Sequence, residues 1–253
     1  MCRHLAYTGP SITLEQLILE PEHSLLQQAR APRHQTHGSD NADGFGVGWY
    51  DRGRRAAPAR YRTTQPIWED ASFASFSGLV STNAALAAVR NASPGMPIEE
   101  TSTAPFADGP WLFSHNGVVP DFHNGIGREL RREVSDRRAS GVASPTDSEL
   151  LFALVLDRLD AGTPPADALV AVVKLVDEVV DEPSRARLNF LLTDGERVVA
   201  TACRNSLFVF DDRHQTGAVV VASEPYDDDA GWEVVKDGSV VELGDDKLEV
   251  RPF

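Results

Sequence analysis

The residue best suited to covalent chemistry stands second in the chain, in the opening sequence MCRHLAY. Removal of Met1, which a small side chain at position 2 permits, leaves Cys2 with a thiol and a free α-amine. An unperturbed α-amine titrates near ~7.7–8.0, so it can take the thiol proton near neutral pH. One residue then supplies both a nucleophile and its base. In the competing interpretation, Cys2 is merely the first inward-facing residue of a strand over CRHLAY.

Acyl transfer from an amide also needs hydrogen-bond donors for the oxyanion, and the run SHNGVV contains two candidates. Asn116 can donate from its side-chain amide, and Gly117 can donate its backbone N–H with no side chain in the way. An Asn-Gly pair also occurs in ordinary turns. The pair therefore supports an oxyanion hole only in combination with other features.

Two charged residues could hold the ends of an amino-acid substrate. Arg90, in AAVRNASPG, stands at the end of an expected strand and can grip a carboxylate with a bidentate fork. Asp147, in SPTDSELL, stands at an expected helix start and could bind an ammonium group. The alternatives are a plain surface charge for Arg90 and a favourable first-turn charge for Asp147.

Taken together and in this order, several segments resemble the class II glutamine amidotransferase domains, which are N-terminal-nucleophile hydrolases. The segments are the N-terminal Cys2, DGFGVGW, VRNASPG, FSHNGVV and TDSELL. The resemblance covers most of residues 1–155, and the β-rich remainder suits the rest of that fold. It implies a four-layer αββα sandwich of two mainly antiparallel sheets.

The same resemblance implies a role for each candidate residue. Cys2 would be the nucleophile, and Asn116 with Gly117 would form the oxyanion hole. Arg90 would bind the glutamyl α-carboxylate and Asp147 the α-ammonium group. Ser93 and His115 are assigned to the same glutamyl-binding site.

The chain also departs from the common family pattern. Asn91 and Pro94 stand where members often carry Trp and His, and the chain opens CRHLAY instead of the commoner CGI type. We therefore expect a leaving group other than ammonia alone. Within the family, the segments SLLQQAR, APRHQTHGSDNADGFGVGWY and ASEPYDDDAGWEVV resemble the stand-alone hydrolases of ergothioneine biosynthesis. This implies a small γ-glutamyl substrate, γ-glutamyl-hercynylcysteine S-oxide.

Three other functions stay open at this point. The chain could be a glutaminase subunit that delivers ammonia to a partner enzyme. It could be a cysteine acylase for non-glutamyl amides, which would not need Arg90 and Asp147. It could also be a binding module without catalysis, as it would be if Met1 were retained.

Composition narrows the protein class and its partners. The 253 residues suit one α/β-type domain spanning 1–253, and a net charge of −14 argues against nucleic acid as a partner. No apolar stretch approaches the ~18 residues of a membrane span, and the first 25 residues show no secretory signal, so we expect a cytoplasmic protein. Cys2 and Cys203 make no disulfide framework, and Cys203 is expected in the core. The sequence gives no indication of oligomeric state.

No metal or cofactor is expected. His34 and His37 lack a third ligand at a recognised spacing, so they are better placed in a loop beside the leaving group. The glycines of GFGVG lack the GxGxxG spacing of nucleotide-binding loops, and no helix start follows them.

The pattern of apolar residues predicts the elements that position these groups. Short helices are expected over 13–20, 24–30 and 70–78, and long core-facing helices over 144–162 and 166–182. The segment over 122–138 is expected to become a charged surface helix toward its end. Strands are expected near 45–50, 85–90 and 111–119, the last broken at Asn116–Gly117. After Pro183 the pattern is β throughout, with a hairpin at Asp194–Gly195. The order favours an α+β fold of antiparallel sheets with helices on their outer faces.

Overall fold

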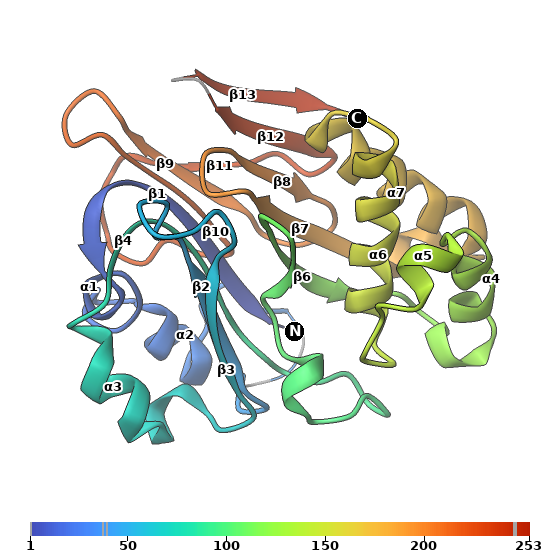
Figure 1. Ribbon diagram of the computed structural model, residues 1–253, viewed down its shortest axis with the longest axis horizontal. Helices are drawn as coiled ribbons and strands as arrows, with labels where there is room; N and C mark the ends of the chain where they lie inside the picture. The colour runs from blue at the N-terminus through green and yellow to red at the C-terminus, as the bar shows by residue number, and fades with distance from the viewer. Residues whose placement is uncertain (1, 37, 39, 245–246) are drawn as a thin grey trace.

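The computed structural model describes residues 2–36, 38, 40–244 and 247–253. Within these residues, two antiparallel sheets are stacked face to face and helices cover both outer faces (Figure 1). The seven-stranded sheet has the order β11-β9-β10-β1-β4-β2-β3, and the six-stranded sheet has the order β13-β12-β8-β7-β6-β5. The predicted αββα sandwich is confirmed.

The strands of the seven-stranded sheet are β1 (Arg3–Thr13), β2 (Phe45–Trp49), β3 (Ala59–Thr63), β4 (Ser81–Val89), β9 (Phe208–Asp212), β10 (Ala218–Ala222) and β11 (Trp232–Val234). Those of the six-stranded sheet are β5 (Phe106–Asp108), β6 (Trp111–Val118), β7 (Arg187–Thr193), β8 (Val198–Ala202), β12 (Ser239–Gly244) and β13 (Lys247–Pro252). The α-helices are α1 (Leu14–Ile18), α2 (Leu25–Arg30), α3 (Ala71–Ser77), α4 (Ile126–Arg132), α5 (Asp136–Ala139), α6 (Asp147–Asp160) and α7 (Pro165–Val179). Short 3₁₀ turns cover Ile67–Glu69, Glu100–Ser102, Phe122–Asn124 and Pro183–Arg185.

Three apolar clusters hold the four layers together. The helices α1, α2 and α3 pack on the outer face of the seven-stranded sheet, where Phe73 meets Phe45. The long helices α6 and α7 cover the six-stranded sheet, where Phe152 stacks on Phe113. Small and aliphatic side chains fill the space between the sheets: Ala6, Leu86, Leu112, Leu191, Ala200 and Val221. Cys203 is 3 % exposed and packs in the helix-covered core, as predicted.

Local sequence signals explain the helix and hairpin predictions that are confirmed. The Thr146 side chain accepts a hydrogen bond from the Glu149 backbone N–H, so α6 begins at Asp147, within the predicted range. Pro165 opens α7, where a missing N–H costs nothing. The strands β7 and β8 pair up to Thr193 and Val198 around the predicted Asp194–Gly195 turn.

The segment over 122–138 is helical toward its end, as expected, but it forms two short helices, α4 and α5, because Ser135 starts a new helix by accepting from the Arg138 backbone N–H. One expectation about local structure was wrong. The strand over 111–119 is not broken at Asn116–Gly117: β6 runs continuously from Trp111 to Val118, paired with β7 throughout. Gly117 lies within the strand, where the absence of a side chain lets β7 pass close to it, and it forms no turn.

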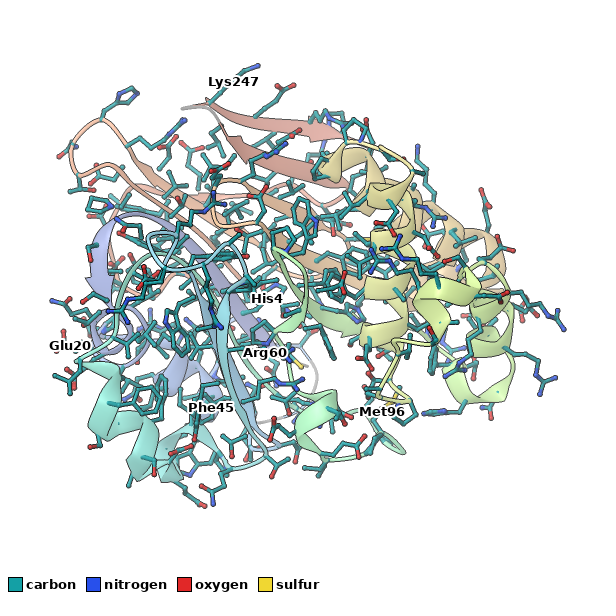
Figure 2. The ribbon with its side chains drawn as sticks, viewed as in Figure 1. His4, Glu20, Phe45, Arg60, Met96 and Lys247 are labelled. Carbon is teal, nitrogen blue, oxygen red and sulfur yellow. The ribbon has the colours of Figure 1, made fainter. Side chains whose placement is uncertain are left out.

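The site depends on the place of β1 in the middle of its sheet. β1 pairs with β10 on one side and with β4 on the other, and its first residue, Arg3, lies opposite Val89. Cys2 precedes β1 and Arg90 follows β4, so the two residues lie at the same end of the sheet. His4, two residues beyond Cys2, lies between the sheets, whereas Phe45 lies on the helix-covered side (Figure 2).

Candidate active site

Cys2 lines a small cavity between the two sheets. The cavity has a volume of about 30 Å³. It is lined by Cys2, Ala88, Val89, Arg90, Ser102, Ala104, Phe106, Ser114, His115 and Ser148. Three of the residues singled out from the sequence, Cys2, Arg90 and His115, therefore meet at one place.

Arg90 has an unused guanidinium nitrogen at this cavity. The residue is only 8 % exposed, and its Nη2 donates to the Pro97 carbonyl oxygen at 2.8 Å. Its Nη1 is buried and has no hydrogen-bond partner among the described residues. A buried, unsatisfied donor is costly, and a charged one more so. A carboxylate in the cavity would satisfy it.

Asp147 is connected to the cavity through its neighbour Ser148. Its Oδ2 accepts from the Val119 backbone N–H at 2.9 Å, and its Oδ1 accepts from the Ser148 N–H at 2.7 Å. The residue is 6 % exposed and does not itself line the cavity. The first turn of α6 thus presents Ser148 to the cavity and holds the carboxylate directly behind it.

His115 stands in the cavity wall, and both of its ring nitrogens are in hydrogen bonds. Its Nε2 lies 2.9 Å from the Arg187 carbonyl oxygen, which can only accept, so Nε2 carries the proton. Its Nδ1 lies 3.0 Å from Ser148 Oγ, and the Ser148 hydroxyl donates to Asp147 Oδ1 at 3.2 Å. Burial lowers the pKa of His115, although the Asp147 carboxylate opposes this effect. His115, Ser148 and Asp147 form a continuous polar chain.

The two predicted oxyanion-hole residues lie next along β6, behind the residues that line the cavity. Asn116 is fully buried, and its Nδ2 donates to Ser223 Oγ at 3.2 Å. Gly117 is packed against β7: a Cβ there would lie 1.7 Å from the Arg187 carbonyl oxygen. Only glycine fits at this position.

Ser93 is not brought into the cavity. It lies in the segment after Arg90, where its carbonyl oxygen accepts from the Met96 N–H at 2.9 Å. The same segment approaches Cys2 through another residue, since the Cys2 Sγ lies 3.8 Å from the Asn91 carbonyl oxygen.

A buried charge pair that sequence reasoning missed lies directly behind Cys2. Arg3 Nε donates to the Cys2 carbonyl oxygen at 2.7 Å, and Arg3 Nη1 pairs with Glu224 Oε1 at 3.0 Å. Both side chains are 0 % exposed. The signal was present in the sequence: Glu224 is a single acid immediately after the apolar run AVVVAS.

The Glu224 carboxylate is ionised despite its burial. Burial alone would raise its pKa, but hydrogen bonds from His23 and from the His34 and Arg33 backbone N–H groups, with the Arg3 charge, bring the pKa below its ordinary value. Burial conversely lowers the pKa of Arg3. His34 thus contributes its backbone to this pair, while His37 lies outside the described residues.

A larger cavity of about 500 Å³ lies on the other side of Phe106, which lines both spaces. Arg60, Arg62, Phe152 and Glu149 are among its lining residues, and no cysteine is. The Cys2 thiol is therefore found only at the smaller of these two cavities. No group of three or more His, Cys, Asp or Glu within the described part of the chain is placed to hold a metal ion. Nor does any helix of that part have the length and apolar character needed to cross a bilayer.

Comparisons with known proteins agree with this geometry. The model of the family "Glutamine amidotransferases class-II" matches residues 24–215. The gamma-glutamyl-hercynylcysteine sulfoxide hydrolase of Mycolicibacterium smegmatis is 41% identical over 100% of both chains. The protein of the same name from Mycobacterium tuberculosis is 39% identical over 96% of this chain and 93% of its own.

A solved structure shares the whole fold. The glutamine aminotransferase class-II domain protein of Silicibacter pomeroyi superposes with a TM-score of 0.72 at 25% identity, covering 100% of this chain and 99% of its own. The glutamine phosphoribosylpyrophosphate amidotransferase of B. subtilis superposes with a TM-score of 0.65 over 99% of this chain and 49% of its own, at 15% identity. On the match over residues 24–215 and the full-length relatives, this chain belongs to the class II glutamine amidotransferase family.

Proposed function

We propose that this protein is a cysteine-dependent γ-glutamyl amidohydrolase that cleaves γ-glutamyl-hercynylcysteine S-oxide into glutamate and hercynylcysteine S-oxide. Relatives with 39% and 41% identity over nearly their whole length carry the name of that hydrolase. The structural observation that carries the proposal is the shared cavity of the Cys2 thiol and the unsatisfied Arg90 Nη1. We place the reaction in the cytoplasm, with a small molecule as the only partner it requires.

In the proposed complex the glutamyl group is held by its two charged ends. Arg90 takes the α-carboxylate, which supplies the missing acceptor for its Nη1. Asp147, held at the start of α6, balances the α-ammonium group through the Ser148 side of the cavity. His115 contacts the glutamyl chain from the cavity wall, and Ser93 contacts the glutamyl group once the segment after Arg90 has moved to admit it.

Catalysis follows from the position of the terminal residue. After Met1 is removed, the Cys2 α-amine takes the thiol proton and the thiolate attacks the γ-carbonyl carbon. Asn116 and Gly117 stabilise the oxyanion, the amine returns the proton to the leaving nitrogen, and a γ-glutamyl thioester remains. Water then hydrolyses the thioester and frees the thiol. Arg90 contributes by orienting the acyl group before attack.

The site must widen to admit this substrate. A cavity of about 30 Å³ is close to the space of one water molecule. Arg90 Nη2 binds the Pro97 carbonyl oxygen, and the Asn91 carbonyl oxygen lies over the Cys2 thiol. The segment from Asn91 to Pro97 is therefore the part of the wall that has to move when a glutamyl group enters.

The deciding experiment measures products from synthetic γ-glutamyl-hercynylcysteine S-oxide and from glutamine. We expect stoichiometric glutamate from the first substrate, much slower ammonia release from glutamine, and no turnover of either by Cys2→Ala. Cys203→Ala is the matched control, because this second cysteine lies in the helix-covered core. Turnover by Cys2→Ala would refute the mechanism.

A second function has support of its own. The probable glutamine amidotransferase of Saccharomyces cerevisiae is 27% identical over 100% of this chain and 84% of its own. A glutaminase subunit that passes ammonia to a partner enzyme would release ammonia briskly from glutamine. It would leave larger γ-glutamyl amides uncleaved, so the same assay separates the two functions.

A further inference from the structure

We infer that Ser223 and Glu224 are positioning residues of the Cys2 site: Ser223 fixes the carboxamide of Asn116, and Glu224 fixes the Cys2 backbone through Arg3. The two residues are consecutive and follow β10 directly. Each reaches a different part of the catalytic machinery. The inference rests on the proposed function, in which Cys2 is the nucleophile and Asn116 an oxyanion donor.

Ser223 is the side chain that orients Asn116. Its Oγ accepts from Asn116 Nδ2 at 3.2 Å and from the His4 backbone N–H at 3.0 Å, and it is fully buried. Within the described residues, the bond to Ser223 is the one hydrogen bond of the Asn116 carboxamide, whose Oδ1 has no partner. One Nδ2 hydrogen is therefore used for orientation, and the second stays available to an oxyanion.

The backbone of Asn116 is held by a separate set of contacts. Asn205 Nδ2 donates to the Asn116 carbonyl oxygen at 2.9 Å. Asn189 lies opposite Asn116 in the β6–β7 ladder, and its Nδ2 donates to the Asn205 carbonyl oxygen at 3.2 Å. Loss of the Ser223 hydroxyl should therefore release the Asn116 carboxamide while the strand stays in place.

Glu224 is the anchor of the nucleophile. Its two oxygens accept from Arg3 Nη1 at 3.0 Å, from His23 Nε2 at 2.9 Å, and from the backbone N–H groups of Arg33 at 2.7 Å and His34 at 2.9 Å. Arg3, fixed in this way, donates its Nε to the Cys2 carbonyl oxygen at 2.7 Å. That oxygen is only a few bonds from both the thiol and the α-amine of Cys2.

Ser206 joins the two sets of contacts, which we call the Ser223 arm (Ser223 to Asn116) and the Glu224 arm (Glu224 through Arg3 to Cys2). Its Oγ donates to the Ser223 carbonyl oxygen at 2.8 Å and accepts from Arg3 Nη1 at 3.4 Å. The position of the oxyanion donor Asn116 and that of the nucleophile Cys2 therefore both depend on the same two consecutive residues, Ser223 and Glu224. A buried ion pair is often no more stabilising than apolar residues of the same volume, so its place directly behind Cys2 suits alignment better than stability.

The Ser223 arm is tested with a mutant cycle. We expect Ser223→Ala to lower kcat by up to about 10²-fold with KM unchanged, since it disorders one oxyanion donor. In an Asn116→Ala background the same change should cost less than about twofold, because no carboxamide is left to orient. Ser77→Ala, which removes another fully buried serine hydroxyl, in α3, is the control and should leave turnover unchanged. Equal losses in both backgrounds would overturn this arm.

Alkylation of Cys2 by iodoacetamide separates the two arms, because this reaction forms no oxyanion. Ser223→Ala should alkylate at the wild-type rate. Glu224→Gln and Arg3→Lys should lower both alkylation and kcat by roughly tenfold to hundredfold, the range expected when a reacting atom is misplaced. If Glu224→Gln does not fold, Ser206→Ala cuts only the contacts of Ser206 and should lower alkylation in the same direction.

Wild-type alkylation rates in all three variants of the Glu224 arm would overturn that arm. Failure of the proposed function would look different: Cys2→Ala would keep its activity, or the wild type would not turn over γ-glutamyl substrates. The alkylation results would then still report whether Glu224 positions Cys2.

Discussion

The Cys2 thiol and the Arg90 guanidinium line one cavity because β1 and β4 are paired with Arg3 opposite Val89. The two functional residues lie just outside the paired segments, on neighbouring strands. In the proposed complex, a substrate bound to Arg90 by its carboxylate would therefore lie at a fixed position relative to the Cys2 thiol. The distance between the two groups would then set how far the reactive carbonyl can be from that carboxylate.

Replacing Arg90 should abolish recognition of the glutamyl carboxylate. Charge-assisted hydrogen bonds contribute about 1.5–3 kcal/mol each, so loss of a bidentate pair in Arg90→Gln should lower kcat/KM by about 10²–10⁴-fold. Steady-state kinetics with a γ-glutamyl amide measures this. Arg60→Gln is the matched control, since Arg60 lines only the larger cavity. Undiminished activity of Arg90→Gln would instead favour an acylase for non-glutamyl amides.

The role of Asp147 can be isolated by changing the substrate. A glutaryl amide lacks the α-ammonium group of a γ-glutamyl amide but is otherwise the same. We expect Asp147→Asn to reduce the preference for the γ-glutamyl amide by roughly tenfold, the coupling of one charge pair. Asp157→Asn, on the same helix and bound to Ser135, should leave that preference unchanged. An equal loss on both substrates would show that Asp147 serves only the start of α6.

Local signals in the sequence predicted those parts of the fold that local interactions decide. The Thr146 cap and the Asp194–Gly195 turn act over a few residues, and both are confirmed. The charged segment over 122–138 is helical toward its end, as expected, but charged periodicity alone does not show that Ser135 divides this part into two helices. Asn116–Gly117 was misjudged as a break because nothing local reveals that β7 passes close to Gly117.

The site likewise contains residues that the sequence motifs predicted and contacts that the sequence did not reveal. The order of motifs led to Cys2, Arg90 and His115, and the fold brings these three together. The contacts behind them join residues far apart in the chain: Arg3 with Glu224, and Asn116 with Ser223. Such pairs depend on which strands become neighbours, and neither composition nor periodicity encodes that choice.

Gly117→Ala should be strongly disruptive. The added Cβ would lie 1.7 Å from the Arg187 carbonyl oxygen and 2.5 Å from His115 Nε2, so β6 and β7 would have to separate. That movement breaks the hydrogen bond between His115 Nε2 and the Arg187 carbonyl oxygen. We expect a destabilisation of about 1–3 kcal/mol or more, read from urea unfolding, together with loss of turnover. Gly53→Ala, where the atom nearest to the added Cβ would be Asp51 Oδ1 at 3.5 Å, should change neither.

The buried histidines predict how stability depends on pH. Burial, with the charges of Arg3 and His115, lowers the pKa of His4 well below its ordinary value of 6.5. Burial also lowers the pKa of His115. Below pH 6.5 the unfolded chain therefore binds more protons at these residues than the folded protein does, so acidification favours unfolding.

Each histidine should remove about 1.4 kcal/mol of unfolding free energy per pH unit between its ordinary pKa and its folded one. Urea unfolding from about pH 7.5 to about pH 5.5 measures the slope around the ordinary histidine pKa. His4→Gln should be less stable overall but should lose stability less steeply on acidification. His214→Gln, which changes an exposed histidine, should keep the wild-type slope. An unchanged slope in His4→Gln would mean that folding does not lower the pKa of His4, so that His4 gains its proton equally in both states on acidification.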